Sequence, residues 1–397
     1  MKKRFLRDIA EIQTGPFGSQ LHKEDYVDVG TPIVTVEHLG CRVFSEQNLP
    51  MVSDTDKSRL SKYVLKKGDI VFSRVGSVDR CSFVDPKHDG WMFSGRCLRV
   101  RPSEEVDSLF LYYFFCLNTT KEFVRSIAVG ATMPSINTKL LGEVEVVCPE
   151  IEEQRKIADI LSKIDDKIEE NQKINENLEQ QAQALFKSWF LNYEPWKGIA
   201  PNSWLHGKLG DFADIKRGGS PRPIQEYLSD SGLRWLKISD VTSLQTPFII
   251  DIKDHIIEEG LKKTVFLKAG SLVLSNSATP GIPKILDVDS CIHDGWLYFP
   301  ESKFSNEYLY LYFKYIRQQL VNLSNGSVFN NLKTDILKGY PTILPDEETL
   351  QRFDGIIKPM FLQMQNLTRE SHNLMDLRDT ILPRLMSGEL DVSGIDL

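Results

Sequence analysis

The sequence predicts an α+β protein in which two similar mixed α/β domains are separated by a long antiparallel two-helix coiled coil. Two observations predict this fold. A 41-residue stretch carries a heptad pattern and contains no glycine, and the chain repeats itself at an offset of roughly 200 residues. A two-fold repeat of one domain and one long helix would have approximate two-fold symmetry.

The 41-residue stretch, Glu150 to Phe190, is predicted to form one helix. Pro149 and the acidic residues after it are typical of a helix start. At about 1.5 Å per residue this helix would be roughly 60 Å long, so it requires a partner helix. Its heptad seam consists of Ile157, Leu161, Ile164, Ile168, Asn171, Asn175, Leu178 and Leu185. We expect the two central asparagines to fix the register of the pair.

The internal repeat supplies the partner. Seven segments recur in the same order, which chance does not explain. They include Phe5–Gly15 with Lys208–Gly218, Leu65–Arg74 with Leu267–Asn276, and His88-Asp-Gly-Trp91 with His293-Asp-Gly-Trp296. The predicted partition is a first domain at 1–149, a first long helix at 150–190, a linker at 191–203, a second domain at 204–345, a second long helix at 346–390 and a tail at 391–397.

The second long helix keeps the seam but is less regular. Its seam residues are Phe353, Ile357, Met364, Leu367, Leu374 and Ile381. Pro359 and Pro383 fall inside it, and each removes an amide donor and clashes with the preceding turn. We therefore expect a break or kink near Lys358 and another near Leu382.

Composition predicts a soluble protein without a membrane span. Hydrophobic residues make up 41% of the chain and charged residues 26%. None of the six cysteines forms a Cys-x-x-Cys pair, which favours reduced thiols and a cytoplasmic protein. The net charge of −7 arises from the two long helices: residues 150–190 carry −4 and residues 346–397 carry −5, which leaves +2 elsewhere. A basic patch on the domains is compatible with this distribution.

Motifs for catalysis are missing. The chain has no Asn/Asp-Pro-Pro-aromatic motif of amino-group methyltransferases, no Walker-type phosphate loop and no convincing nuclease cluster of carboxylates with a lysine. The two His-Asp-Gly-Trp segments suggest a general base, but a turn before a strand is the better interpretation. No metal ligand set or cofactor loop is predicted.

DNA binding has support from the loops, which differ between the repeats. Ser73-Arg74 in one copy is replaced by Ser275-Asn276 in the other, and arginine and asparagine are the residues that contact guanine and adenine edges bidentately. For each single residue, a solvated surface charge is the simpler alternative. The candidate DNA-binding residues are Lys57, Arg59, Ser73, Arg74, Arg80, Lys139, Arg217, Arg222, Ser275, Asn276, Lys284 and Lys333.

Taken together, these features resemble the specificity (S) subunit of Type I DNA restriction–modification systems. The resemblance covers nearly the whole chain. The residues that carry it are Gly15–Ser19, Leu65–Arg74, Gln154–Ala158 and the ending Leu382–Leu390.

The resemblance implies that each domain is a target recognition domain that reads one half of a split, asymmetric DNA sequence. It also implies that the paired helices set the spacing of the half-sites and dock two methyltransferase subunits. Such a subunit is not catalytic and binds no cofactor; S-adenosylmethionine, ATP and Mg are used by the methyltransferase and restriction subunits. The alternatives are a disguised methyltransferase or restriction enzyme, and an interaction scaffold or antirestriction-type protein that uses the coiled coil.

Overall fold

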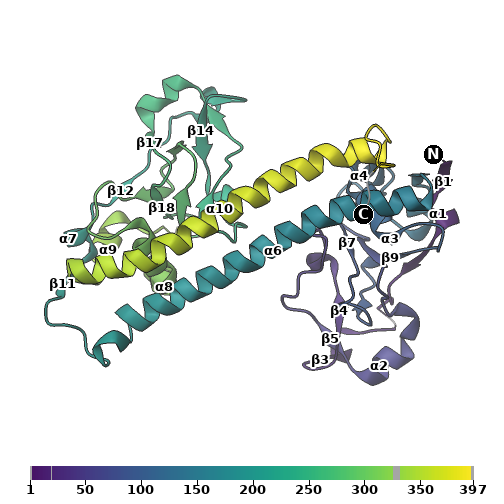
Figure 1. Ribbon diagram of the computed structural model, residues 1–397, viewed down its shortest axis with the longest axis horizontal. Helices are drawn as coiled ribbons and strands as arrows, with labels where there is room; N and C mark the ends of the chain where they lie inside the picture. Colours follow the sequence, from purple (N-terminus) through teal and green to yellow (C-terminus); the bar gives the residue numbers. More distant parts are fainter. Residues whose placement is uncertain (1, 19, 325–330, 395–397) are drawn as a thin grey trace. The chain divides into compact units, whose positions relative to one another are not determined.

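The computed structural model describes residues 2–18, 20–324 and 331–394, and it divides into two compact units (Figure 1). Unit 1 comprises residues 1–167 and 374–397, and unit 2 comprises residues 168–373. Two 40-residue helices, α6 (Ile151–Phe190) and α10 (Glu347–Met386), each contribute one part to each unit. Neither long helix forms a unit of its own.

The described residues of unit 1 form three small sheets. Strands β1 (Lys2–Phe5) and β10 (Glu145–Cys148) pair antiparallel. A four-stranded antiparallel sheet has the order β2 (Ala10–Thr14), β9 (Cys97–Pro102), β6 (Ile70–Ser73), β7 (Cys81–Phe83). The other has the order β3 (Tyr26–Val27), β5 (Met51–Val52), β4 (Thr31–Val34), β8 (Met92–Phe93), with β4 and β8 parallel. Its short helices are α1 (Leu6–Ile9), α2 (Asp54–Arg59), α3 (Ser108–Cys116), α4 (Asn118–Ser126) and α5 (Thr138–Leu141).

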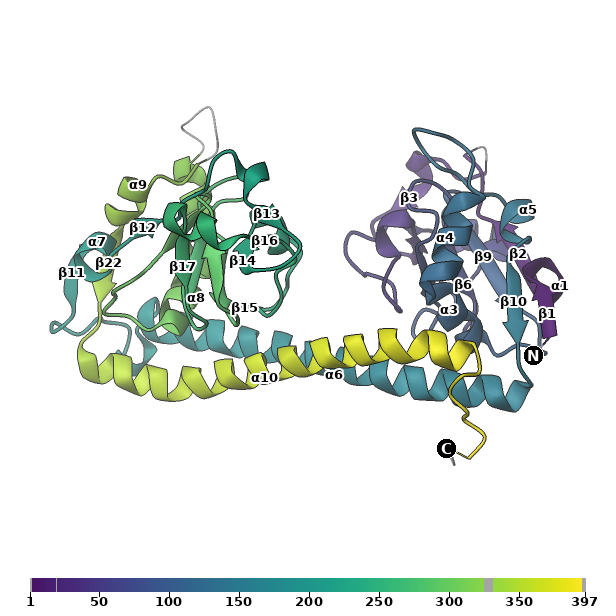
Figure 2. The same ribbon diagram turned by 90° about the horizontal axis from the view of Figure 1, so that it is seen from above.

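Helix α3 is the centre of the core of unit 1. Its sequence, SLFLYYFFC, is apolar all round, and the Asp107 carboxylate caps its first turn by accepting hydrogen bonds from the amides of Leu109 and Phe110. One core cluster joins α3 to β6 and β9 and to the parts of α6 and α10 that belong to unit 1. The long helices therefore complete the core of the domain and lie to one side of its sheets (Figure 2).

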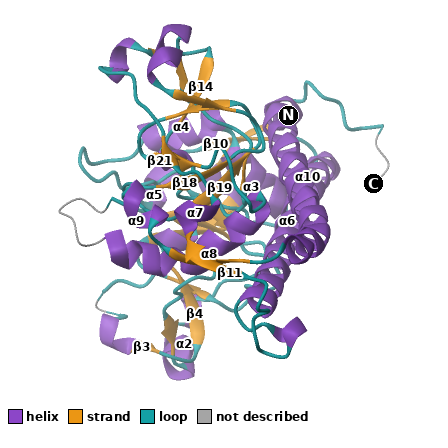
Figure 3. Ribbon diagram, turned by 90° about the vertical axis from the view of Figure 1, so that its left-hand side faces the viewer, coloured by secondary structure: helices purple, strands orange, loops and turns teal. Residues whose placement is uncertain are grey.

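Unit 2 repeats this plan with two additional strands. Strands β11 (Leu205–Lys208) and β22 (Pro341–Leu344) pair antiparallel. One sheet has the order β12 (Lys216–Arg217), β21 (Trp296–Tyr298), β18 (Leu272–Ser275), β19 (Pro283–Leu286), β15 (Phe248–Ile249). The other has the order β13 (Leu228–Ser229), β16 (His255–Ile256), β14 (Leu233–Leu236), β20 (Ser290–Ile292), β17 (Val265–Leu267). Its helices are α7 (Leu209–Phe212), α8 (Asn306–Ser324) and α9 (Thr334–Lys338), and Figure 3 shows helices and strands in separate colours.

Strand pairing confirms the internal repeat but corrects one of its matches. Ser73 pairs with Cys97, and the corresponding Ser275 pairs with Trp296. The counterpart of Trp296 is therefore Cys97, and the identical segment His88–Trp91 lies before β8, outside the equivalent position. The packing agrees, because a side chain at Gly15 would meet the carbonyl of Ser94, and one at Gly218 would meet that of His293. The register of the paired strands therefore aligns the two repeats more reliably than the four identical residues of the His-Asp-Gly-Trp segments.

The long helices contact each other in both units and run antiparallel. In unit 1 the Arg378 guanidinium donates to the Asp165 carboxylate over 2.7 Å. In unit 2 the amides of Asn171 and Asn175 donate to Glu370 over 2.9 Å and to Thr368 over 3.2 Å. All predicted seam residues are buried or half-buried: Ile157, Leu161, Ile164, Ile168, Asn171, Asn175, Leu178, Leu185, Phe353, Ile357, Met364, Leu367, Leu374 and Ile381.

The expected breaks near Lys358 and Leu382 are wrong, because α10 is continuous through Pro359 and Pro383; a kink at these places stays a prediction. Both prolines are on the exposed side of the helix, as is Gly355, whose carbonyl would otherwise accept the amide hydrogen bond of residue 359. Water can solvate that carbonyl. Burial of Ile357 and Phe361 on the opposite side stabilises the helix against the cost of the proline, about 3 kcal/mol.

Candidate nucleic-acid interface

In unit 1, Arg74 stands at the end of β6, where three loops meet. Its amide donates to the carbonyl of Arg96 over 2.8 Å, and its carbonyl accepts from the amide of Ile136 over 2.9 Å. The guanidinium donates through Nη1 to the carbonyl of Gly95 over 3.1 Å and lies 5.7 Å from the ring centre of Phe17. This backbone framework holds a half-buried arginine beside an exposed aromatic ring.

Exposed apolar side chains occur on the loops next to Arg74. Phe17 is 55% exposed, and Val129 and Met133 are also exposed. The loop that carries Val129 and Met133 is tied to the loop after β6, because the amide of Gly76 donates to the carbonyl of Pro134 over 2.8 Å. Exposed apolar groups near a cation are typical of an interaction site, and thymine methyl groups and bases are suitable partners for them.

In unit 2, Asn276 occupies the position of Arg74. Its amide donates to the carbonyl of Gly295 over 2.8 Å, and its carbonyl accepts from Leu332 over 2.7 Å. Its side-chain Nδ2 donates to the carbonyl of Asp294 over 3.2 Å, as Arg74 does to Gly95. Asn276 is only 4% exposed, however, so its side chain stabilises this turn and does not face solvent. The prediction that Asn276 contacts a base is therefore wrong for this conformation.

The two preceding serines are also buried and act within the fold. The Ser73 hydroxyl donates to the carbonyl of Val75 over 2.7 Å, and the Ser275 hydroxyl donates to that of Thr279 over 2.6 Å. Both hydroxyls thus shape the loop that follows the strand. They were predicted as DNA contacts because they precede Arg74 and Asn276 at the ends of corresponding strands, but residue type does not show which way a side chain points at the end of a buried strand.

Lys284 is the clearest correction among the candidates. It is 4% exposed, and its ammonium donates to the carbonyls of Leu244 and Thr246. Burial, the largest effect, lowers the pKa of Lys284 to about 8, despite the opposing charge of Glu179. Lys284 therefore anchors the loop at 244–246, and its prediction as a DNA-binding residue is wrong.

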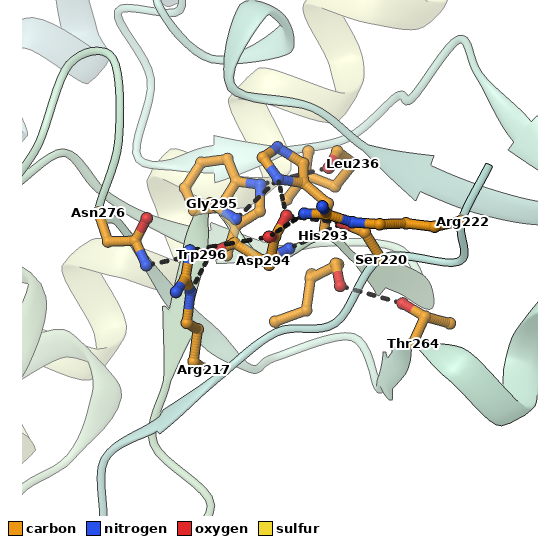
Figure 4. Close-up of polar contacts among 11 residues, drawn as sticks. Arg217, Ser220, Arg222, Leu236, Thr264, Asn276, His293, Asp294, Gly295 and Trp296 are labelled. Carbon is orange, nitrogen blue, oxygen red and sulfur yellow. Dashed lines mark hydrogen bonds and ion pairs between the residues drawn. The ribbon is translucent and has the colours of Figure 1, made fainter. Parts of the chain in front are cut away.

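A polar cluster of unit 2 lies beside Asn276 and is drawn in Figure 4. Its centre is the Asp294 carboxylate, which accepts from the Ser220 hydroxyl over 2.7 Å and from Nη2 of Arg222 over 3.1 Å. Nε of Arg217 donates to the Asp294 carbonyl over 2.5 Å. Burial acts to raise the pKa of Asp294, but the Ser220 hydrogen bond and the two guanidinium groups outweigh it, so this pKa is lowered. Asp294 is thus an ionised residue to which two predicted DNA-binding arginines, Arg217 and Arg222, donate hydrogen bonds.

An open pocket of about 630 Å³ adjoins this cluster. Arg222, Lys237 and His293 line it together with apolar groups that include Trp235 and Ile224. Burial lowers the pKa of His293, so its imidazole tends to be neutral. The pocket presents cations beside an apolar wall.

The remaining candidates are placed on the surface. Arg59 is exposed but binds the Asp56 carboxylate and the Gln20 carbonyl. Lys57 is half-buried, and Arg80, Lys139 and Lys333 are exposed. Their contact with DNA stays a prediction.

Phe17, Ser220 and Asp294 are the residues that sequence reasoning missed. Asp294 belongs to the repeated His-Asp-Gly-Trp segment, which was interpreted as a turn, and only the fold brings it to Arg217 and Arg222. Among the described residues, no group of three or more His, Cys, Asp or Glu side chains could hold a metal ion. In the same part of the chain, every helix is too short or too polar to cross a membrane.

Comparisons with known proteins agree with these observations. The family model of the Type I restriction modification DNA specificity domain matches residues 1–180 and again 201–366. A Type I restriction enzyme specificity subunit of Methanocaldococcus jannaschii is 28% identical over 75% of this chain and 72% of its own length. One from Haemophilus influenzae is 24% identical over 90% of this chain and 92% of its own length. The crystal structure of an S subunit from M. genitalium has the same fold, with a TM-score of 0.62 at 18% identity over 97% of this chain and 95% of its own.

Proposed function

Because the chain belongs to the family of Type I restriction–modification specificity subunits, we propose that it reads a bipartite, asymmetric DNA target with one half-site for each domain. It is a non-catalytic recognition subunit with two DNA specificity domains. Its role is to bring the modification and restriction subunits to the DNA sequence that these domains recognise.

One observation carries this proposal. The two units share sheet order and the backbone framework around Arg74 and Asn276, but the groups presented there differ. Unit 1 presents Arg74 beside Phe17, whereas unit 2 presents Arg217 and Arg222 around Asp294. A common framework with different polar groups at its loops is expected of two modules that read different sequences.

The proposed partners are double-stranded DNA, two methyltransferase subunits and the restriction subunits. Type I complexes use S-adenosylmethionine for methylation and ATP with Mg for cleavage, and we assign these cofactors to the partner subunits. The relatives from Methanocaldococcus jannaschii and Haemophilus influenzae are specificity subunits of restriction enzymes, which supports a role within such a complex.

The test is selection of the preferred sequence from a pool of random DNA duplexes by the purified full chain with its methyltransferase subunits. We expect an asymmetric motif with two conserved blocks and a fixed spacer, and binding that weakens as salt increases. Binding without any sequence preference would contradict the proposed function.

Arg74→Ala extends this test to one domain. We expect the variant to lose preference within one block and to keep the other block unchanged, because Arg74 belongs to unit 1 alone. An equal loss of affinity for all sequences would make Arg74 a phosphate contact. Arg7→Ala is a suitable control, since this exposed arginine of α1 pairs with Glu143 and lies outside the loops around Arg74.

A further inference from the structure

The cluster around Asp294 differs from an ordinary surface ion pair in that neighbouring groups hold its carboxylate. Asp294 is held by the Ser220 hydroxyl, which donates to its carboxylate over 2.7 Å and accepts from its amide over 3.2 Å. A side chain at Gly218 would meet the carbonyl of His293, so the loop after β12 lies directly against the Asp294 turn. The carboxylate therefore has a defined place before any ligand arrives.

Arg222 is oriented on the same loop. Pro221 and Pro223 flank it, and the proline rings fix φ on both sides and restrict the backbone of Arg222 to extended conformations. Its Nη2 donates to the Asp294 carboxylate over 3.1 Å, yet the side chain is 79% exposed. One donor of the guanidinium is thus engaged by Asp294, and the side chain is otherwise open to solvent.

The pairing of Arg222 with Asp294 favours a base edge over a phosphate as the ligand of this arginine. A phosphate contact requires positive charge but little orientation, and a carboxylate 3.1 Å from the guanidinium weakens attraction to phosphate. A guanine edge presents two neutral acceptors, O6 and N7, which need two donors in a fixed plane. A carboxylate that orients an exposed arginine favours this second kind of contact.

We propose that Arg222, oriented by Asp294, contacts the O6 and N7 acceptors of one guanine in the half-site of the second domain. Arg222 is the specificity-determining residue, and Asp294 is a positioning residue that acts through it. Unit 1 has Gly95 at the position of Asp294, so this arrangement is specific to unit 2. The inference rests on the proposed function, because it assigns one base position within the second half-site.

The test compares the motif selected from random duplexes by the full chain with its methyltransferase subunits, for the native protein and three variants. Arg222→Ala should reduce the preference for guanine at one position about 5- to 150-fold and leave the other block unchanged. Arg222→Lys should retain affinity but lose most of this preference, because an ammonium is not a planar bidentate donor. Asp294→Asn should lower the preference for the same guanine while overall affinity stays equal or rises.

Arg234→Ala is the matched control, since Arg234 is an exposed arginine of unit 2 outside the cluster. We expect it to leave the motif unchanged, and thermal unfolding should show that all four variants are folded. An unchanged motif for Arg222→Ala, or a loss that is equal at every position, would overturn the proposal. Both results are distinct from failure of the proposed function, in which the native protein itself selects no bipartite motif.

Discussion

At the scale of single residues, buried carboxylates on α6 join the long helices to the domain cores. The Asp165 carboxylate accepts from the Tyr113 hydroxyl of α3 and from Arg378 of α10, each over 2.7 Å. In unit 2, Glu179 likewise accepts from Tyr310 and Lys314 of α8. These acids are buried partners of the core, whereas the heptad pattern places them beside the seam and does not predict their burial.

Asp165→Ala should lower the free energy of unfolding of unit 1 by about 2 kcal/mol, because it leaves the buried Tyr113 hydroxyl without its acceptor and removes one of the two carboxylates that pair with Arg378. Urea unfolding measures this change. Arg155→Ala removes an exposed pair with Glu152 and should cost less than about 0.5 kcal/mol. Equal effects of the two substitutions would show that the Asp165 contacts add little.

The buried Lys284 predicts a pH dependence of stability. Its folded-state pKa of about 8 lies below the usual 10.5, so between these values the unfolded chain binds more protons than the folded one. The free energy of unfolding should therefore rise with pH in this window, by at most about 1.4 kcal/mol per pH unit from this group. Because buried tyrosines and cysteines oppose this trend, the measurement is the difference between the native protein and Lys284→Met from pH 7 to 10. That difference should shift in favour of the native protein, and a flat difference would contradict the assignment.

Residue type predicted the candidate site only in part. The exposed cations Arg217 and Arg222 were identified from sequence because charge usually remains in water. Lys284 and Ser275 were misplaced because the direction of a side chain at a strand end depends on which loop covers it. Asp294 was missed since its partners are more than 70 positions away in the chain.

At the scale of elements, the heptad pattern predicted the helix pairing but not the docking of the helices on their domains. Seam residues such as Leu161 and Met364 are buried, as expected. Ala158, Phe186 and Phe190 are equally buried, because a second face of α6 packs on the domain cores. A single seam therefore underestimates the apolar surface of a helix that has two kinds of neighbour.

Gly355 lies inside helix α10 and lowers the stability of this helix. A side chain there would meet open space, and the residue lies on the exposed side of the helix. Gly355→Ala should raise the free energy of unfolding of unit 2 by about 1 kcal/mol, by restricting the unfolded chain and favouring the helix. Thermal unfolding is the measurement. Gly270→Ala is the control, because this glycine also faces open space but has φ of +88°, so alanine should destabilise it.

At the scale of the whole molecule, the duplication was readable from sequence because it repeats local patterns in a constant order. The predicted partition treated the long helices as separate segments, whereas each compact unit takes one part of both helices. Sequence could not show this, because the contacts within each unit join segments far apart in the chain, such as Tyr113 with Asp165 and Asp165 with Arg378.

We expect the length of the helix pair to determine the length of the DNA spacer between the two half-sites. Lengthening both helices tests this prediction. Insertion of one heptad into both helices, between Lys167 and Ile168 and between Asn373 and Leu374, preserves the seam and the pairs within each unit. Seven residues add about 10 Å of helix, which corresponds to about three base pairs at 3.4 Å each. The motif selected from random duplexes should keep both blocks and gain a spacer about three base pairs longer.

A heptad inserted into α6 alone leaves the helices unequal in length and should abolish bipartite selection, because the seam can no longer be matched on both sides. An unchanged spacer with the double insertion would show that spacing is set within the domains and not by the helices.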